Sequence, residues 1–174
     1  VLRTQHIGYV ALDNDPTQIE VLRRFGTKVF YGDPSRPDLL RAAGADTAKL
    51  LVVALGDPED VIRVVDVARR NFPDLPILAR ARNRRTVHLL MERDISMIVR
   101  ETFHSGLVMT EMALDTLGIA PERAREIVAG FRELDEKALV EQMAIRDDET
   151  KLIQSARQLN QELEALFRGD RTAG

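Results

Sequence analysis

Short apolar runs alternate with segments of helical periodicity along this chain up to Ile98. The runs are centred near Val10, Val29, Val52, Leu78 and Ile98. A short, unbroken apolar run is typical of a strand buried on both faces of a parallel sheet, and the segments between the runs are long enough for a helical crossover. We therefore predict an α/β fold, a Rossmann-like doubly wound parallel sheet with helices on both faces.

Capping residues mark where several of the expected helices begin and end. Asp15 and Pro16 suit the cap and the first position of a helix that Gly26 ends. Asp57 suits the cap of another helix, which has an apolar stripe on one face. The stripe consists of Val61, Val64, Val65 and Ala68. Residues 1–5 are typical of the last turn of a helix.

A mostly helical tail follows the alternating part. Residues 102–117 are expected to form one helix, which Gly118 ends, and apolar residues recur between residues 127 and 143. Further on, apolar side chains recur at steps of four and three, at Leu152, Ala156, Leu159, Leu163 and Leu166. Such a seam suits packing against another helix, either in the same domain or in a second chain. Because the alternating part already has its helices, we favour a second chain and predict a homodimer.

Candidate site residues stand where the expected strands end, which is where ligands bind in such folds. These positions are held by Asp13, Asp33, Ala54 and Arg80. A carboxylate directly after the first strand suits a grip on the ribose hydroxyls of a nucleotide, which would be the role of Asp13. The other interpretation is that the acidic residues here only cap the next helix, through Asp15. Both can hold, because Asp13 and Asp15 are separate groups.

A cluster of arginines directly follows the fourth expected strand. Its members are Arg80, Arg82, Arg84 and Arg85. A planar guanidinium group can bond two oxygens of a carboxylate or phosphate at once. Arginines at a helix N-terminus also oppose the helix dipole, which favours a functional reason for their presence. We therefore predict an anion site at Arg80 and Arg82, and a surface location for Arg84 and Arg85.

Composition argues against several other classes of protein. The net charge of −3 gives no indication of a nucleic-acid partner. The absence of cysteine excludes disulfides, thiolate metal sites and a cysteine nucleophile. His6, His88 and His104 are not at metal-ligand spacing, so we expect no metal site and ordinary surface or half-buried histidines. No run approaches the roughly 18 apolar residues of a membrane span. No catalytic constellation stands out, so we expect no catalytic residues and no enzyme.

Three stretches of the sequence carry a resemblance to a known family. They are Tyr9-Val-Ala-Leu-Asp-Asn-Asp-Pro16, Lys28-Val-Phe-Tyr-Gly-Asp33 and Ala79-Arg-Ala-Arg-Asn83. They resemble the cytoplasmic nucleotide-binding domains that regulate potassium transport, the TrkA-N (RCK/KTN) family. Within it, Phe30-Tyr-Gly-Asp33, Ala79-Arg-Ala-Arg82 and Arg100-Glu-Thr-Phe103 are similar to the glutathione-gated potassium efflux antiporters of the Kef type. The similarity covers about Leu2 to Leu117 closely, and the tail to about Lys151 more loosely.

The resemblance implies a ligand-sensing regulatory domain of a potassium:proton efflux antiporter, gated by a nucleotide and by glutathione or its adducts. By this resemblance Asp13 would hold a ribose, Asp33 would lie near the adenine, and Arg80 and Arg82 would meet phosphate or glutathione. The nucleotide would be AMP or NAD(H), and glutathione would be the regulatory ligand.

Together with the tail pattern, the resemblance also implies boundaries and partners. Residues 1–118 would be the nucleotide-binding TrkA-N domain, residues 119–168 a helical dimerisation tail, and residues 169–174 disordered. The domain, itself soluble, would form a homodimer at the cytoplasmic face of the inner membrane. It would belong to the same polypeptide as the membrane antiporter domain, and would bind a flavin-containing ancillary subunit.

The sequence departs from this family at its beginning. Members open with a strand and a Gly-x-Gly-x-x-Gly loop, whose amides cradle phosphates, ahead of the first helix. Here the sequence starts inside that helix, at Val1, so we expect the first strand and the loop to be absent from the chain. The sheet could then be completed by direct pairing of the strands near Val10 and Val52, or by a strand from a second copy. A segment upstream of this sequence is the third route, and we favour it.

Two other functions remain open. The alternating part would also fit the nucleotide half of an NAD-dependent oxidoreductase, although the helices after Val99 contain no polar catalytic cluster. The chain could also be a pure dimerisation module that has lost ligand binding. Binding of AMP, NAD(H) or glutathione would separate these alternatives.

Overall fold

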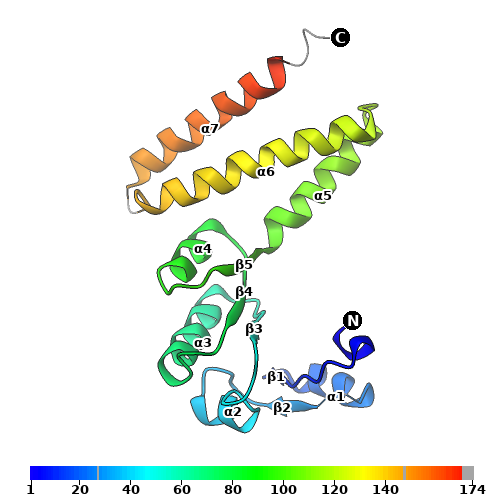
Figure 1. Ribbon diagram of the computed structural model, residues 1–174, viewed down its shortest axis with the longest axis vertical. Helices are drawn as coiled ribbons and strands as arrows, with labels where there is room; N and C mark the ends of the chain where they lie inside the picture. The colour runs from blue at the N-terminus through cyan, green and yellow to red at the C-terminus, as the bar shows by residue number, and fades with distance from the viewer. Residues whose placement is uncertain (27, 147, 170–174) are drawn as a thin grey trace. The chain divides into compact units, whose positions relative to one another are not determined.

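The computed structural model describes residues 1–26, 28–146 and 148–169 (Figure 1). The chain divides into two compact units. The first unit contains residues 1–82 and 89–99, and the second contains residues 83–88 and the chain from residue 100 onward. Each unit is described below by itself.

The first unit alternates strands and helices in the predicted order. Its strands are β1 (Ala11–Asp13), β2 (Val29–Tyr31), β3 (Leu51–Val53), β4 (Ile77–Ala81) and β5 (Met97–Arg100), of which Arg100 belongs to the second unit. Its helices are α1 (Pro16–Arg24), α2 (Pro37–Ala42) and α3 (Pro58–Asn71). Helix α4 (Arg84–Met91) connects β4 to β5 and is shared between the two units. The start of the chain is a short 3₁₀ turn, η1 (Leu2–Gln5), where we expected the last turn of a helix.

The predicted helix caps are confirmed. The Asp15 side chain accepts a hydrogen bond from the Thr17 N–H at 2.8 Å, at the start of α1. Asp57 accepts hydrogen bonds from the N–H groups of Glu59 and Asp60 at the start of α3, at 2.8 and 3.2 Å. A proline occupies the first turn of each helix, where no amide hydrogen is needed.

The strands form two sheets where one was predicted. Strands β1 and β2 pair in parallel, with Leu12 opposite Phe30. Strands β3, β4 and β5 form the other sheet in that order, and β3 is parallel to β4, with Val52 opposite Leu78. Parallel strands with connecting helices confirm the Rossmann-like fold class. However, no strand among the described residues links β1 to β3, so these two strands do not close up on each other.

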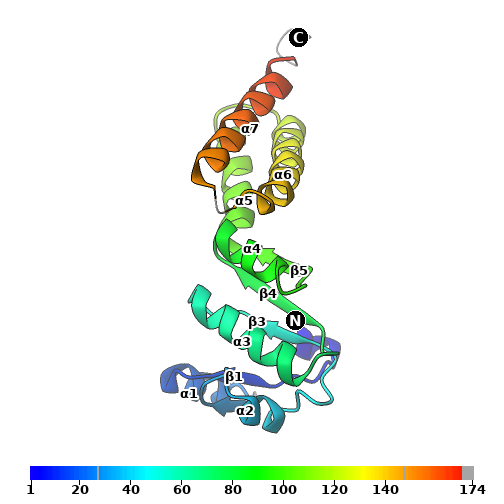
Figure 2. The same cartoon turned by 90° about the vertical axis from the view of Figure 1, so that its left-hand side faces the viewer.

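The core of the first unit lies between α3 and the β3–β4 ladder (Figure 2). The predicted stripe on α3 is fully buried, at Val61, Val64, Val65 and Ala68. Along β4 the buried side chains alternate, as expected for a strand with one face on the core. Ile77, Ala79 and Ala81 point inward, so that Arg80 is carried on the other face.

Gly32 makes the turn that follows β2. Its φ of +145° is one that residues with a side chain rarely adopt, and a Cβ there would lie 2.9 Å from the Leu39 side chain. Its N–H donates to the Asp13 carbonyl oxygen at 3.0 Å. Glycine at this position therefore lets the chain end β2 close to the end of β1.

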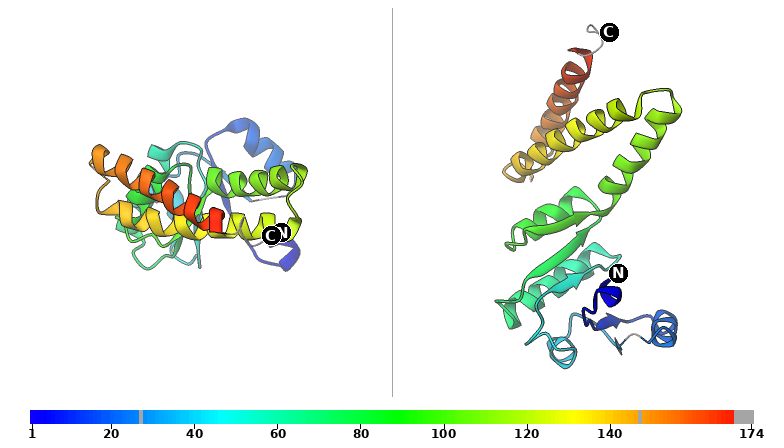
Figure 3. Two further views of the ribbon diagram at one scale, coloured as in Figure 1. Left: turned by 90° about the horizontal axis from the view of Figure 1, so that it is seen from above. Right: turned by 45° about the vertical axis from the view of Figure 1, so that its right-hand side comes forward.

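The second unit is helical (Figure 3). It contains the first part of α4, with α5 (Glu101–Thr116), α6 (Pro121–Met143) and α7 (Glu149–Gly169). Helix α6 packs against both α5 and α7. Its buried side chains follow helical spacing, at Ala124, Val128, Asp135, Ala138, Leu139 and Gln142.

The apolar seam on α7 lies partly against its own unit, and our preference for a second chain stays a prediction. Helix α7 packs against α6 of the same chain, and Leu152, Leu159 and Leu163 are half-buried there. The Leu166 side chain lies outside the described residues, as do residues 170–174 of the segment that we expected to be disordered. The leucines at these three positions are thus partly covered by their own unit, whereas Ala156 of the seam is exposed. In the described residues, no helix is both long and apolar enough to cross a membrane.

Candidate functional site

Asp13 and Asp33 lie at the same edge of the two-stranded sheet. Asp13 ends β1 opposite Tyr31, and Asp33 follows two residues later, after the turn at Gly32. Each carboxylate accepts a backbone N–H two residues further on, Asp13 from Asp15 and Asp33 from Ser35, both at 2.8 Å. The remaining acceptor capacity of both carboxylates suits hydroxyl or amine donors on a ligand.

The hydrogen bonds of Asp33 favour its charged form. Its pKa lies below the ordinary value, chiefly because the Ser35 backbone N–H donates to the carboxylate and secondly because the Ser35 side chain does. The positive charges of Arg63 and Arg36 act in the same direction, and the slight desolvation opposes them. Asp33 is therefore an anion over the whole physiological pH range.

Ala54 and the two candidate arginines lie at the matching edge of the other sheet. Val53 ends β3 opposite Ala79, so Ala54 follows at the level of Arg80. Arg80 is half-buried inside β4, and Arg82 is exposed directly after it. The structure thus brings Asp13 together with Asp33, and Ala54 together with the two arginines, at the carboxyl ends of parallel strands in the first unit.

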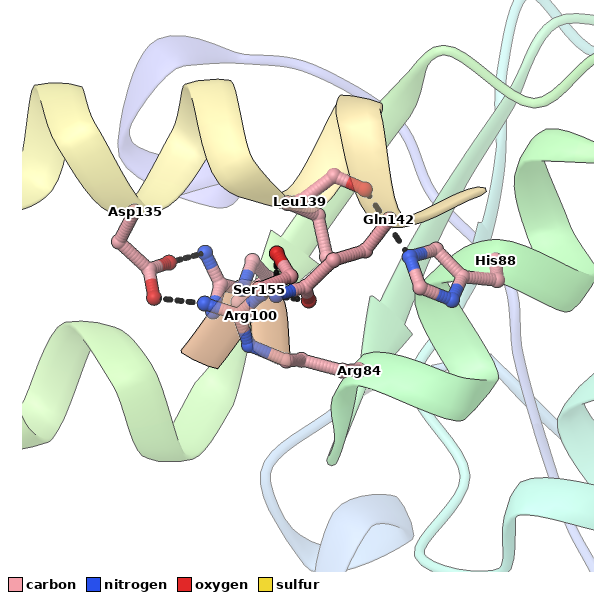
Figure 4. A network of polar contacts seen from close by, with 7 residues as sticks. All are labelled: Arg84, His88, Arg100, Asp135, Leu139, Gln142 and Ser155. Carbon is pink, nitrogen blue, oxygen red and sulfur yellow. Dashed lines mark hydrogen bonds and ion pairs between the residues drawn. The ribbon is translucent and has the colours of Figure 1, made fainter. Parts of the chain in front are cut away.

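Arg84 is not the surface residue that we predicted. It lies in the first turn of α4 and contacts Oδ1 of Asp135, on α6 (Figure 4). Arg100, at the start of α5, contacts Oδ2 of the same carboxylate. Arg84 also donates to Oε1 of Gln142 at 2.6 Å. Of Arg84 and Arg85, the two arginines that we expected at the surface, only Arg85 is exposed.

The network extends on both sides of Asp135. The Gln142 side-chain amide donates to Oγ of Ser155, on α7, at 3.0 Å. The Arg100 guanidinium lies 3.8 Å from the centroid of the Phe103 ring, which stacks on Phe131. One buried carboxylate is therefore paired with two guanidinium groups, which compensates the cost of removing it from water.

His88 is also more buried than we predicted. Its Nε2 lies 3.0 Å from the Leu139 carbonyl oxygen. Because a carbonyl oxygen can only accept, Nε2 must carry the hydrogen. Among the described residues, no group of histidine and acidic side chains is placed to bind a metal ion.

A sequence signal for the network existed in α6. Asp135 interrupts the apolar side chains of that helix at a position in register with the buried Val128 and Gln142. A charged residue on an inward face requires a charged or hydrogen-bonding partner. The identity of that partner could not be predicted, because Arg84 and Arg100 are remote from Asp135 in the chain.

Comparisons with known proteins give two family matches. The model of the TrkA-N domain matches residues 1–101, and the model of the potassium efflux system KefB C-terminal domain matches residues 105–174. Among solved structures, the Kef C-terminal domain of Shewanella denitrificans in AMP-bound form is 37% identical, with a TM-score of 0.75. The match covers 83% of this chain and 88% of that one.

More distant structures share the fold. The TrkA-N domain of the inner membrane protein ybaL from Escherichia coli is 24% identical over 64% of this chain and 82% of that chain, with a TM-score of 0.59. The GsuK channel bound to NAD is 20% identical over 63% of this chain and 20% of that chain, with a TM-score of 0.57. At these identities the likeness concerns the fold alone.

Proposed function

This chain belongs to the TrkA-N family and to its Kef-type branch, and from that premise we propose that it is a ligand-sensing regulatory domain of a potassium:proton efflux antiporter. In this proposal it responds to a nucleotide, AMP or NAD(H), and to glutathione or its adducts. The observation that carries the proposal is the similarity to a Kef C-terminal domain that is itself described as AMP-bound.

The proposed nucleotide site uses the strand ends of the first unit. Asp13 accepts hydrogen bonds from ribose hydroxyls, and Asp33 lies near the adenine. Arg80 and Arg82 meet the phosphate or the carboxylates of glutathione, and Ala54 leaves room for the ligand beside them. Anionic Asp33 and the guanidinium groups are the chemistry that supports these roles.

The experiment is a thermal-shift and calorimetric titration of the 174-residue chain with AMP, NAD(H) and glutathione. Arg80→Ala and Arg82→Ala should each weaken binding by about 1.5–3 kcal/mol, because each removes a charge-assisted contact. Arg85→Ala is the matched control, since Arg85 is an exposed arginine of the same cluster. Equal affinities in all three variants would remove the arginines from the site. Absence of stabilisation by every ligand would contradict the sensor function.

The partners follow from the same proposal. The chain acts as a homodimer at the cytoplasmic face of the cell membrane, as part of the polypeptide that carries the antiporter domain. A flavin-containing ancillary subunit binds it. A regulatory role predicts that NAD(H) binds without being consumed, whereas the alternative, half of an oxidoreductase, requires turnover. Absorbance of NADH, followed with the chain and an added carbonyl substrate as hydride acceptor, distinguishes the two.

A further inference from the structure

The turn after β2 brings Arg36 back onto Asp33. The Arg36 N–H donates to the Asp33 carbonyl oxygen at 3.1 Å, and the Ser35 N–H donates to the Asp33 carboxylate at 2.8 Å. The hydrogen bonds of Ser35 lower the pKa of Asp33 most, and the positive charge of the Arg36 side chain acts in the same direction. A ligand group that meets the Asp33 carboxylate therefore lies beside Arg36.

The guanidinium group of Arg36 is held in a fixed plane. Its Nε and Nη2 donate to Oδ1 and Oδ2 of Asp38, at 3.2 and 2.6 Å. Two parallel hydrogen bonds set the orientation of the plane as well as the position of the charge. The hydrogen bond to Asp38 also raises the pKa of Arg36 further, so the group is always a cation.

Two prolines make this geometry rigid. Pro34 and Pro37 enclose Ser35 and Arg36, and the ring of each proline fixes its own φ. The residue before a proline is confined to extended backbone, and Arg36, directly before Pro37, has φ −89° and ψ 120°. Pro37 opens α2, so Asp38 is placed in the first turn of that helix. The position of the guanidinium plane is therefore set before any ligand binds.

The pairing with Asp38 leaves the faces of this plane open to stacking. The N–H donors of a guanidinium group lie in its plane, so Asp38 occupies an edge and neither face. The side chains of Arg36 and Asp38 are 66 and 65% exposed. An ion pair this exposed contributes little to stability, so holding the fold together is a poor explanation for it. A flat cation of this kind attracts the face of an aromatic ring.

We propose that the purine base of the bound nucleotide stacks on the Arg36 guanidinium group, and that Asp38 is a positioning residue that holds this platform. The Asp33 carboxylate accepts from the amino group at the edge of the base, while Arg36 covers its face. This inference rests on the proposed function, because it uses the adenine position beside Asp33. It adds a contact that only the base can make, so a ligand with ribose and phosphate but no base gains nothing from Arg36.

The test is calorimetry of the 174-residue chain with AMP and with ribose 5-phosphate, which has no base. Arg36→Ala should lower AMP affinity by about two- to fivefold, the range of an exposed cation–π contact, and should leave ribose 5-phosphate affinity unchanged. Arg36→Lys keeps the charge and loses the plane, so it should lose most of the same AMP affinity. Arg24→Ala is the matched control, because Arg24 is an exposed arginine paired with Glu20 on α1, and it should bind AMP like the wild type.

Asp38→Asn tests the positioning role. The amide has one oxygen, so it accepts only one of the two hydrogen bonds and releases the plane. The substitution should weaken AMP binding by less than Arg36→Ala does. It should have no further effect in a chain that already carries Arg36→Ala, because the two residues act as one unit. Equal effects of Asp38→Asn in both backgrounds would overturn its role as the holder of the platform.

The outcomes separate the platform from the proposed function. If the wild type binds AMP and Arg36→Ala binds it equally well, the platform is overturned and the sensor function stands. The same holds if Arg36→Lys keeps the full AMP affinity, or if AMP and ribose 5-phosphate lose affinity by the same factor, since Arg36 would then act through its charge. If the wild type binds no AMP, the proposed function fails for this nucleotide and the platform falls with it.

Discussion

Four aspartates that follow or end strands make the same local hydrogen bond. Asp13, Asp15, Asp33 and Asp57 each accept the backbone N–H two residues further on, at 2.8 Å. This turn is a property of the short aspartate side chain, so it does not distinguish a capping residue from a ligand-binding one. The two interpretations of the acidic residues after the first strand are therefore compatible, as the sequence suggested: Asp15 caps α1, and Asp13 keeps a role to be tested.

At the residue scale, Asp33 provides a pH-dependent prediction. Its folded pKa lies below its unfolded value, which is about 3.9. Its contribution to stability is therefore fully present above about pH 5 and is lost as the pH falls through the folded pKa. Ser35→Ala should raise the pKa of Asp33 without restoring the ordinary value, because the larger cause, the Ser35 backbone N–H, remains.

Titration of the Asp33 carboxyl carbon by NMR measures this effect in the intact chain. Asp148 serves as a control in the same sample, since its pKa is lowered by hydrogen bonds from Lys151 and not from Ser35. The pKa of Asp148 should be the same in the wild type and in Ser35→Ala. An Asp33 pKa that is equal in the two proteins would contradict the assigned cause.

Local chemistry made part of the structure predictable at this scale. Asp15, Asp57 and Gly26 act within three residues of themselves, so their roles follow from the neighbouring sequence. The surface location of Arg84 was wrong for the opposite reason. An arginine after a strand is usually solvated, and its partner Asp135 lies 51 residues further along the chain.

At the element scale, strands depend on pairing more than helices do. We expected a strand near Val52 from its apolar run, and β3 covers only Leu51–Val53, the three residues that pair with β4. Hydrophobic pattern predicts that a strand exists, whereas its length and its neighbours are set by the rest of the sheet. The separation into two sheets could not be predicted from any one of the runs.

The inner edges of the two sheets give a second prediction. The Ala11 N–H donates to the Lys28 carbonyl oxygen and the Leu51 N–H to that of Pro76, at 3.0 and 2.9 Å. Successive residues of a strand point their N–H groups to opposite sides. The N–H of Leu12 therefore points away from β2, and the N–H of Val52 points away from β4. We expect these two amides to exchange faster than those of Ala11 and Leu51.

A longer polypeptide that adds a parallel strand between β1 and β3 should reverse this difference. The amides of Leu12 and Val52 should then become protected, while those of Ala11 and Leu51 change little. NMR-detected exchange of both proteins provides the measurement. Strong protection of Leu12 and Val52 in the 174-residue chain at low concentration would show that its edges are already paired. If the protection appeared only at high concentration, a second copy would supply the strand.

At the scale of the whole molecule, an exposed apolar face on α5 is the strongest candidate for contact with a second copy. Val108, Met109 and Met112 are 59, 70 and 66% exposed. At helical spacing they lie on the side opposite the buried Leu107. Methionine adapts its shape to a facing surface, which suits an interface. We therefore propose this face of α5 as a second candidate contact of the homodimer, beside the α7 seam that suggested it.

The final prediction separates these two surfaces. Met109→Glu combined with Met112→Glu should convert the homodimer into a monomer, because each buried methionine contributes about 1.5–3 kcal/mol and each new carboxylate would have to lose its water. The affinity should fall by about a hundredfold or more. Sedimentation velocity over a range of concentrations measures the change.

Val140→Glu is the matched control, because Val140 is an apolar side chain on α6 that is 60% exposed. It should remain dimeric if α5 provides the interface. Point substitutions are more informative here than cutting the chain after Gly118, since removing α6 would also take away the helix that packs on α5 and leave Arg100 without Asp135. A dimer that persists in the double variant but dissociates in a chain ending at residue 146 would assign the contact to α7, and would restore the seam as the interface.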